Sequence, residues 1–361
     1  MEKNLNSSAN LDFLRSVAIS YVVIAHTLRF LNVDQIGRVE LSIMGKLGVV
    51  LFFVHTSLVL MMSLQRQIAD FGQHGFFKYF YLRRAFRIYP LSILAITSVY
   101  FFKLPMVTCT HPLSYSELDF QQLMSHLGLY QNFYKKPDIL GPLWSLPFEV
   151  QMYIVFPLLF LLAKKVESTS ILLAIWAGLS LVGNSLVPKI DNLNVTFSYY
   201  QIPNFIEWVP CFFAGVIAFH FYEKGTKQQL ASWWLPVMLF LLVPVYILSS
   251  RFEKNFFVAI ILGLTLPLIK EIKSTAVRFF SKQVAKYSYG LYLCHYISLY
   301  FAFELLSSYS WTVRWLAFVS SLVGISMLSY HLVEQPFINF GNRIVFSRKP
   351  KNGAHVSYKA A

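Results

Sequence analysis

Two ionisable residues, Arg15 and His26, lie eleven residues apart in one apolar segment, residues 11–31. A charged side chain in hydrocarbon costs roughly 2.5–3.5 kcal/mol, so such residues usually face a polar interior or take part in function. Eleven helical residues exceed three turns by about 20°, which places both side chains on one face, about 16 Å apart. A guanidinium and an imidazole at this separation suit a long phosphorylated cofactor that enters from one side. The alternative is that Arg15 reaches to the membrane interface and His26 is hydrogen-bonded in the core.

A group of arginines follows within residues 81–90, at the inner end of the third predicted span. Arg84 and Arg87 are three residues apart, so they are neighbours on one helical face. Arg83 adjoins them. Guanidinium groups suit bidentate recognition of phosphate. The alternative is a basic anchor that touches lipid phosphates, but an expected position at the same membrane face as Arg15 favours the phosphate site.

A third polar group occupies residues 141–153, at the outer entrance of the fourth predicted span. Glu149 follows a proline by two residues, so it is expected in the first turn of a helix, where the dipole favours a carboxylate. One interpretation is therefore a helix cap. The other is a carboxylate that orients a sugar hydroxyl or an imidazole, with Trp144 and Tyr153 as stacking or hydrogen-bonding walls.

A second intramembrane histidine, His295, lies in the ninth predicted span and is expected to face the bundle interior. It either joins helices through hydrogen bonds or takes part directly in catalysis. The same two interpretations apply to His55 and His331. The sequence Glu334-Gln-Pro336 closes the tenth span and is predicted as a helix end.

The composition is that of a membrane protein, because 56% of the 361 residues are apolar and only 13% are charged. A soluble protein of this size carries about 25% charged residues. Long uninterrupted apolar runs favour transmembrane helices over alternating β-strands. The first run carries Asp12 and Arg15 and leads into further spans, so it does not resemble a cleavable signal peptide. We predict an all-α polytopic membrane bundle with about ten spans, at residues 11–31, 43–63, 85–103, 146–163, 171–188, 203–221, 233–249, 255–270, 286–306 and 312–333.

The formal net charge of +14 is distributed as a membrane topology requires. With cytoplasmic N- and C-termini, 20 of the 31 Lys and Arg residues fall on the inner side and 10 on the outer side. This bias follows the positive-inside rule. The basic charge is thus expected to attract anionic lipid or a phosphorylated substrate, and no nucleic-acid partner is predicted.

The three cysteines are scattered, with Cys109 in an outer loop and Cys211 and Cys294 in apolar runs. This pattern argues against a disulfide framework or a zinc site, and no metal is expected. Residues 8–340 are predicted to form one membrane domain, and residues 341–361 a short basic cytoplasmic tail. The outer segment 104–145 is either functional, as long loops often are, or a passive connector.

Taken in order, these motifs resemble the acyltransferase-3 family of membrane acyltransferases, which includes O-acetyltransferases of bacterial O-antigen and other surface polysaccharides. The resemblance covers residues 8–340 and implies a ten-helix bundle that moves an acyl group from cytoplasmic acyl-CoA to an acceptor at the outer face. The five motifs are Leu14-Arg15 with His26, Phe52-Phe53, Arg84-x-x-Arg87 before Ile88-Tyr-Pro90, Leu143-Trp-Ser-Leu-x-x-Glu149 with Tyr153 and Pro157, and Ser288-Tyr-Gly-Leu-Tyr-Leu-x-His295 followed by Glu334-x-Pro336.

One motif departs from the family pattern. After Phe52-Phe53 the family usually has a small Ser-Gly pair, whereas here His55 is followed by Thr56-Ser57. A serine in place of glycine adds bulk where helix backbones approach closely. Local packing and the size of the acyl pocket are therefore expected to differ.

The residues and the resemblance together predict a multi-pass protein of the bacterial cytoplasmic (inner) membrane that transfers an acetyl group. The donor is acetyl-CoA, and the acceptor is a hydroxyl of a cell-envelope saccharide, free or lipid-linked, such as O-antigen, capsule or exopolysaccharide. The alternatives are a transporter or exporter of a saccharide or acylated lipid, or a scaffold; no oligomeric state is predicted. The predicted roles are His26 and Glu149 in catalysis, Arg15, Arg83, Arg84 and Arg87 in coenzyme binding, and Trp144, Ser145, Tyr153 and His295 in acceptor binding.

Overall fold

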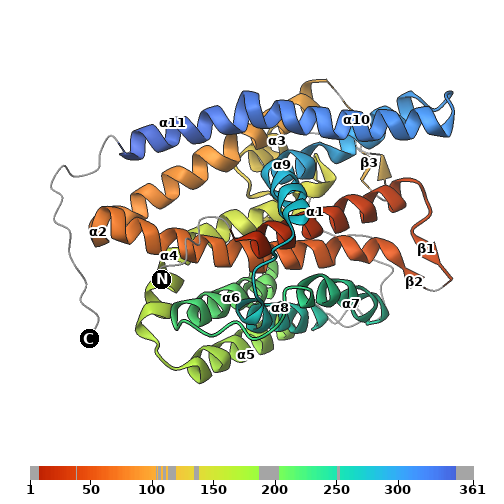
Figure 1. Ribbon diagram of the computed structural model, residues 1–361. Coiled ribbons are helices and arrows are strands. Elements are labelled where there is room, and N and C mark those ends of the chain that lie inside the picture. Colours follow the sequence, from red (N-terminus) through yellow and green to blue (C-terminus); the bar gives the residue numbers. More distant parts are fainter. Residues whose placement is uncertain are drawn as a thin grey trace.

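The computed structural model describes residues 8–37, 39–102, 104, 107–108, 111–112, 119–133, 138–186, 203–249 and 253–346. Within these ranges almost every element is a helix, and the long helices run side by side (Figure 1). The helices are α1 (Ala9–Phe30), α2 (Met44–Phe101), α3 (Phe120–Leu127), α4 (Leu146–Lys165), α5 (Thr169–Leu186), α6 (Pro203–Glu223), α7 (Trp234–Leu248), α8 (Lys254–Thr265), α9 (Thr275–Leu299), α10 (Trp311–Ser329) and α11 (Gln335–Phe346).

Short elements join these helices. Two antiparallel pairs of two-residue strands occur, β1 (Gln35–Ile36) with β2 (Val39–Glu40) and β3 (Val107–Thr108) with β4 (His111–Pro112). The 3₁₀ turns are η2 (Leu41–Ile43), η4 (Gln131–Phe133), η5 (Gly141–Ser145) and η6 (Leu266–Leu268), and the π turns are η7 (Tyr300–Leu305) and η8 (Tyr330–Glu334).

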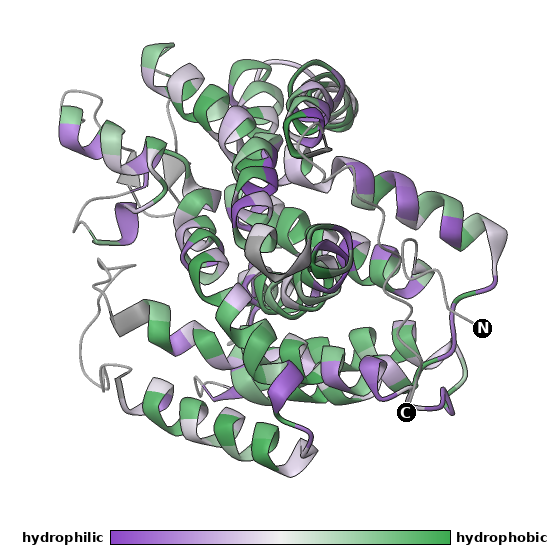
Figure 2. Cartoon of the chain, turned by 90° about the vertical axis from the view of Figure 1, so that its left-hand side faces the viewer, coloured by the Kyte–Doolittle hydropathy of each residue, from purple (hydrophilic) through white to green (hydrophobic). Residues whose placement is uncertain are grey.

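The hydropathy of the helices agrees with the predicted all-α membrane bundle. Five segments of the described chain are long and apolar enough to cross a membrane, namely 9–30, 41–72, 141–165, 205–223 and 311–345. Each of the ten predicted spans falls on helical structure, although the number of crossings stays a prediction. Hydrophobic residues dominate the helices when the bundle is viewed along its length (Figure 2).

Helix α2 is a hairpin of two helical arms rather than two spans joined by a loop. The predicted inner loop between the second and third spans is itself helical, and the chain reverses at Gly72, where φ is +69°. An L-residue disfavours this φ, so glycine is the residue suited to the kink. We call the end of the bundle that carries Gly72 the kink end, and the opposite end, with β1 and β2, the strand end (Figure 1).

The prediction of a helix end at Glu334-Gln-Pro336 is wrong. Helix α10 passes through the π turn η8 into α11, so one helical rod extends from Trp311 to Phe346. Proline at the second position of α11 directly follows the π turn, where the Gln335 N–H bonds to the Tyr330 carbonyl and the regular α-helical bonding is already interrupted. Residues 341–346 of the predicted tail therefore belong to α11, and 347–361 lie outside the described residues.

The departure at Thr56-Ser57 is accommodated by a glycine on another helix. Ser57 is fully buried on α2 and faces Gly215 of α6. A Cβ atom added to Gly215 would lie 2.5 Å from the carbonyl oxygen of Val54 and 2.6 Å from Ser57 Cβ. The close approach of α2 and α6 therefore depends on a small residue on α6 rather than on α2.

Replacing Gly215 with alanine is expected to destabilise the bundle, because the added methyl group meets backbone that cannot move alone. Overpacking of this kind costs about 1–3 kcal/mol. Gly178→Ala on α5 is the matched control, since a Cβ there meets nothing within 4 Å. Thermal unfolding of the two purified variants in detergent should show a lowered midpoint for Gly215→Ala only, and equal midpoints would contradict the assigned packing.

The cysteines agree with a buried structural role where they are described. Cys211 and Cys294 are buried free thiols. Cys109 lies outside the described residues.

Candidate functional site

Two polar layers lie between α1 and α9. In one layer, Arg15 Nε donates a hydrogen bond of 2.5 Å to Ser288 Oγ. In the other, His26 Nδ1 lies 2.8 Å from His295 Nε2. Both α1 side chains therefore face α9, which confirms the prediction that Arg15 and His26 share one helical face. We call these layers the arginine layer and the histidine layer.

The two imidazole rings of the histidine layer are joined edge to edge. Their planes differ by only 2° and their centroids are 5.0 Å apart, as expected for coplanar rings linked through a 2.8 Å hydrogen bond. His295 Nδ1 lies 3.1 Å from the carbonyl oxygen of Leu291, which can only accept a hydrogen bond. His295 is fully buried, and burial without an anionic partner favours neutral rings.

These contacts assign the proton on each ring nitrogen. His295 Nδ1 carries a hydrogen for Leu291, so His295 Nε2 is the acceptor and His26 Nδ1 is the donor. The remaining nitrogen of His26, Nε2, is then unprotonated and presents a lone pair. It faces Gly45 of α2, where an added Cβ would lie 3.6 Å away. The histidine layer thus holds one imidazole in the form that a general base requires.

Aromatic residues and the η5 segment enclose the histidine layer. The Tyr296 ring lies 5.1 Å from His26 and 4.9 Å from His295. The Tyr292 hydroxyl lies 2.9 Å from Ser145 Oγ and donates to the carbonyl oxygen of Pro142. Ser145 is therefore placed beside the histidine layer, through Tyr292.

The arginine layer gathers charges from several helices. Arg15 of α1 interacts electrostatically with Arg87, Glu149 and Glu334. Arg84 interacts with Arg87 and Glu149. The three guanidinium groups and two carboxylates leave one net positive charge, so the layer is matched to an anionic group.

Glu334 and one further residue, His55, are both buried in this layer. Glu334 is 2% exposed, interacts with Arg87 and Arg15, and its Oε1 atom has no hydrogen-bond partner. His55 is buried, interacts with the same two arginines and has an unpartnered Nδ1 atom. Glu334 was predicted only as part of a helix end, and its place in a motif with Pro336 was the available signal.

Glu149 lies in the arginine layer and not beside His26. It accepts a hydrogen bond from the Tyr153 hydroxyl and interacts with Arg15 and Arg84. The predicted orientation of His26 by Glu149 is therefore replaced by orientation through His295. Tyr153, predicted to bind the acceptor, is buried beside Glu149 in the same layer.

Two other predicted site residues, Arg83 and Trp144, have different partners. Arg83 interacts with Asp70 and Arg66, which lie nearer the kink on the α2 hairpin. Trp144 packs against Trp208 and Phe148 in an aromatic cluster, with ring centroids 5.8 and 6.2 Å apart.

The arginine layer lies inside the bundle rather than at its kink end. Arg84 and Arg87 are about 18 Å and about 22 Å from Gly72 along α2, at about 1.5 Å per residue. Residue spacing alone predicts these arginines at the mouth of the bundle, because it predicts a loop where α2 in fact continues as helix. Between the layers, the Tyr289 hydroxyl bonds to Ser92 Oγ at 2.5 Å and to the carbonyl oxygen of Ile88 at 2.9 Å.

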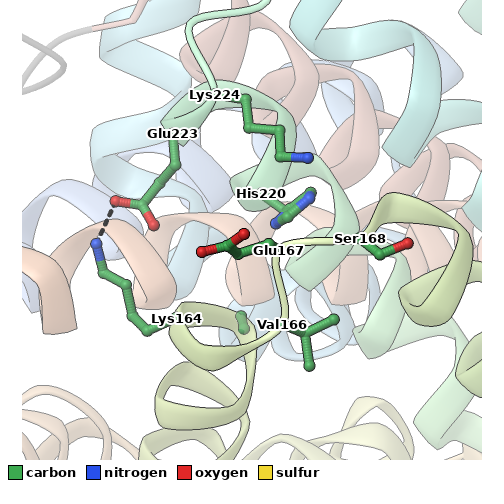
Figure 3. A pocket seen from close by; sticks show the side chains of 8 residues that line it. Lys164, Val166, Glu167, Ser168, His220, Glu223 and Lys224 are labelled. Carbon is green, nitrogen blue, oxygen red and sulfur yellow. Dashed lines mark hydrogen bonds and ion pairs between the residues drawn. The ribbon is translucent and has the colours of Figure 1, made fainter.

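A separate surface cavity of about 550 Å³ lies at the junction of α4, α5 and α6 (Figure 3). Lys164 Nζ pairs with Glu223 Oε1 at 2.5 Å on its rim. Its other charged side chains are Glu167 and Lys224, so its formal charges balance. It contains none of the predicted site residues.

Three comparisons with known proteins give one match. A protein-family model described as an acyltransferase domain matches residues 8–331. Neither a curated protein nor a solved structure matches the chain.

Proposed function

Because the chain belongs to the acyltransferase-3 family and is a membrane acyltransferase, we propose that it transfers an acetyl group from acetyl-CoA to a saccharide hydroxyl. The acceptor is a hydroxyl of a cell-envelope saccharide such as O-antigen, capsule or exopolysaccharide. The protein acts from the bacterial inner membrane, with both termini and the Gly72 kink in the cytoplasm.

The free Nε2 atom of His26 is the observation that supports this reaction most directly. The hydrogen bonds through His295 to Leu291 leave that nitrogen as an acceptor. Nε2 removes the proton of the acceptor hydroxyl while the oxygen attacks the thioester carbonyl. The new C–O bond forms as the C–S bond breaks, and the thiolate of CoA takes up the proton. General-base catalysis of this type contributes about 10²–10⁴ in rate. Attack by His26 itself, through an acyl-imidazole, is the second form of the same proposal.

The arginine layer supports binding of the donor. Arg15, Arg84 and Arg87 carry more positive charge than Glu149 and Glu334 balance. Guanidinium groups bind phosphate oxygens through paired hydrogen bonds. The distance of about 16 Å along α1 from Arg15 to His26 is of the order that an extended pantetheine arm needs. We assign the CoA phosphates to the arginine layer and the acetyl group to the histidine layer.

Acetyl-CoA turnover by the purified full-length chain tests the proposal. In proteoliposomes, radiolabelled acetyl groups from acetyl-CoA are expected to appear in an added envelope saccharide fraction, with release of free CoA thiol. A saccharide transporter or exporter is the second candidate. The only feature that favours it is the set of buried polar residues, which could line a passage as well as an active site. Movement of saccharide across the liposome without acetyl-CoA consumption would replace the proposed function with transport.

Cysteine labelling in cells tests the orientation. In a variant without other accessible cysteines, a membrane-impermeant thiol reagent that reaches the protein from the periplasmic side should label Asp119→Cys and spare His74→Cys. The reverse pattern would place the kink end outside, away from cytoplasmic acetyl-CoA, and would contradict the proposed direction of transfer.

A further inference from the structure

Residues 138–145 form a segment that we call the strap, which leads from the strand-end loops into α4. It contains the 3₁₀ turn η5. Ile139 is 1% exposed, and Leu140 and Leu143 are fully buried in the main hydrophobic core. The strap is therefore an apolar, packed cover rather than a solvated connector.

One side of the strap contacts the residues that enclose the histidine layer. Ser145 and Pro142 both bond to the Tyr292 hydroxyl. A Cβ atom on Gly141 would lie 3.6 Å from the Tyr296 ring, and that ring packs against His26 and His295. Movement of the strap would therefore open the layer that holds the free Nε2 atom.

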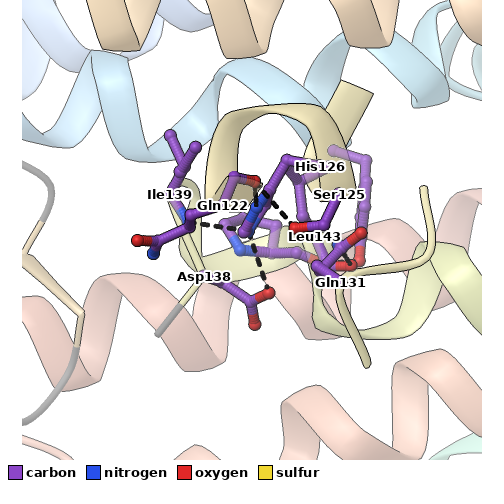
Figure 4. A network of polar contacts seen from close by, with 9 residues as sticks. Gln122, Ser125, His126, Gln131, Asp138, Ile139 and Leu143 are labelled. Atoms are coloured by element: carbon purple, nitrogen blue, oxygen red, sulfur yellow. Dashed lines mark hydrogen bonds and ion pairs between the residues drawn. The ribbon is translucent and has the colours of Figure 1, made fainter. Parts of the chain in front are cut away.

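The other side of the strap is held by two side chains from α3 and η4 (Figure 4). His126 Nδ1 lies 2.8 Å from the carbonyl oxygen of Gln122, so this nitrogen is the donor. His126 Nε2 then accepts a hydrogen bond of 3.0 Å from the backbone N–H of Ile139. Asp138 lies 3.4 Å from the same nitrogen.

The second hold is within η5 itself. Gln131 Nε2 donates a hydrogen bond of 3.1 Å to the carbonyl oxygen of Leu143. Both His126 and Gln131 are buried, at 1% and 3% exposure, and both bond to strap backbone. Buried backbone groups are expensive to leave unpaired, so each contact favours the closed position of the strap.

The proposed function gives this cover a chemical purpose. An unprotonated imidazole beside a thioester activates water as readily as it activates an alcohol. Water would then form the C–O bond, the C–S bond would break, and acetate and CoA would be released without transfer. An acyltransferase therefore has to keep water from His26 while the acetyl group waits for an acceptor.

We propose that His126 and Gln131 are positioning residues that hold the strap over the histidine layer and so suppress hydrolysis of the bound acyl donor. The inference rests on the proposed function, because it concerns the same thioester. It gives the outer segment a functional role: α3 and η4 anchor the strap that excludes water from the reaction.

The test measures acetyl-CoA hydrolysis without an acceptor, by the purified full-length chain in lipid nanodiscs. His126→Leu and Gln131→Leu each remove one hydrogen bond to the strap. Loss of one such bond raises the open fraction of the strap by about tenfold, and release of CoA thiol should rise by about the same factor. Affinity for acetyl-CoA should stay within about twofold, because the arginine layer is untouched.

Two controls separate this role from general damage. Ser125→Ala removes a buried hydroxyl on the same helix that bonds to Gln122 within α3, and hydrolysis should not change. Adding His26→Ala to His126→Leu should abolish the extra hydrolysis, because the proposed base is gone.

The outcomes distinguish the two proposals. Unchanged hydrolysis in folded His126→Leu and Gln131→Leu proteins that still bind acetyl-CoA would overturn the role of the strap alone. Absence of acetyl-CoA binding and acetyl transfer in the unaltered protein would overturn the proposed function, and the strap inference with it. If His126→Leu does not fold, Gln131→Leu decides the question.

Discussion

Replacing His26 with alanine is expected to lower acetyl transfer by about 10²–10⁴-fold, because the change removes the proposed general base. The protein should still insert and accumulate, since His26 is only partly buried and the neighbouring core is unchanged. Affinity for acetyl-CoA should stay nearly constant, because the arginine layer lies about 16 Å away along α1. The measurement is transfer of radiolabelled acetyl groups by equal amounts of folded protein. Near-normal transfer by His26→Ala would remove the catalytic assignment.

Variants of His295 serve as graded controls for the same assignment. His295→Gln offers a side-chain carbonyl that can accept the hydrogen of His26 Nδ1, whereas His295→Leu offers no acceptor. The present contact is 2.8 Å long and fixes which His26 nitrogen carries hydrogen. His295→Leu is therefore expected to lose more transfer activity than His295→Gln, and both less than His26→Ala. Equal losses in the two His295 variants would show that the hydrogen bond does not orient the base.

The sequence was sufficient to predict those features of the fold that are properties of a single helix. Hydropathy alone indicates an all-α membrane bundle, since long apolar runs can satisfy their backbone in lipid only as helices. Helical spacing placed Arg15 and His26 on one face, and both indeed meet α9. These features need only the period of a helix.

The parts that were missed depend on how separate helices are aligned. Glu149 was expected to orient His26 or the sugar from the outer side, yet it interacts with Arg15 and Arg84. Glu149 lies on α4 and the two arginines lie on α1 and α2, and no local sequence pattern indicates how far one helix is shifted along another. The His26–His295 pair was missed for the same reason. It joins residues 269 positions apart in the chain.

Strand-end contacts were also beyond sequence reasoning. His126 and Gln131 lie in a segment that composition describes only as a long loop. His126 and Gln131 bond to the backbone of Ile139 and Leu143. A backbone group is present whatever the side chain, so the residue types in the sequence do not reveal such a contact. The sequence could indicate that this segment is long enough for function, but not which side chains hold it.

Lysine substitutions at Arg84 and Arg87 are expected to weaken binding of acetyl-CoA while changing the Michaelis constant of the acceptor little. Lysine replaces a planar fork by a point charge, so paired hydrogen bonds to phosphate are lost although the charge is kept. Hydrogen bonds to charged groups contribute about 1.5–3 kcal/mol, which corresponds to a loss of affinity of about 10–150-fold. Titration of purified protein with acetyl-CoA measures this directly.

Arg83→Lys is the matched control for these two substitutions, because Arg83 adjoins them in sequence but interacts with Asp70 and Arg66 on the α2 hairpin. We expect its affinity for acetyl-CoA to stay within about threefold of the unaltered protein, since no arginine-layer contact is lost. A loss of affinity as large as that of Arg84→Lys would extend the phosphate site toward the kink. Unchanged donor affinity in both Arg84→Lys and Arg87→Lys would instead leave the arginine layer as a structural charge cluster. Donor binding would then have to be sought elsewhere in the bundle, and the transport alternative would gain support.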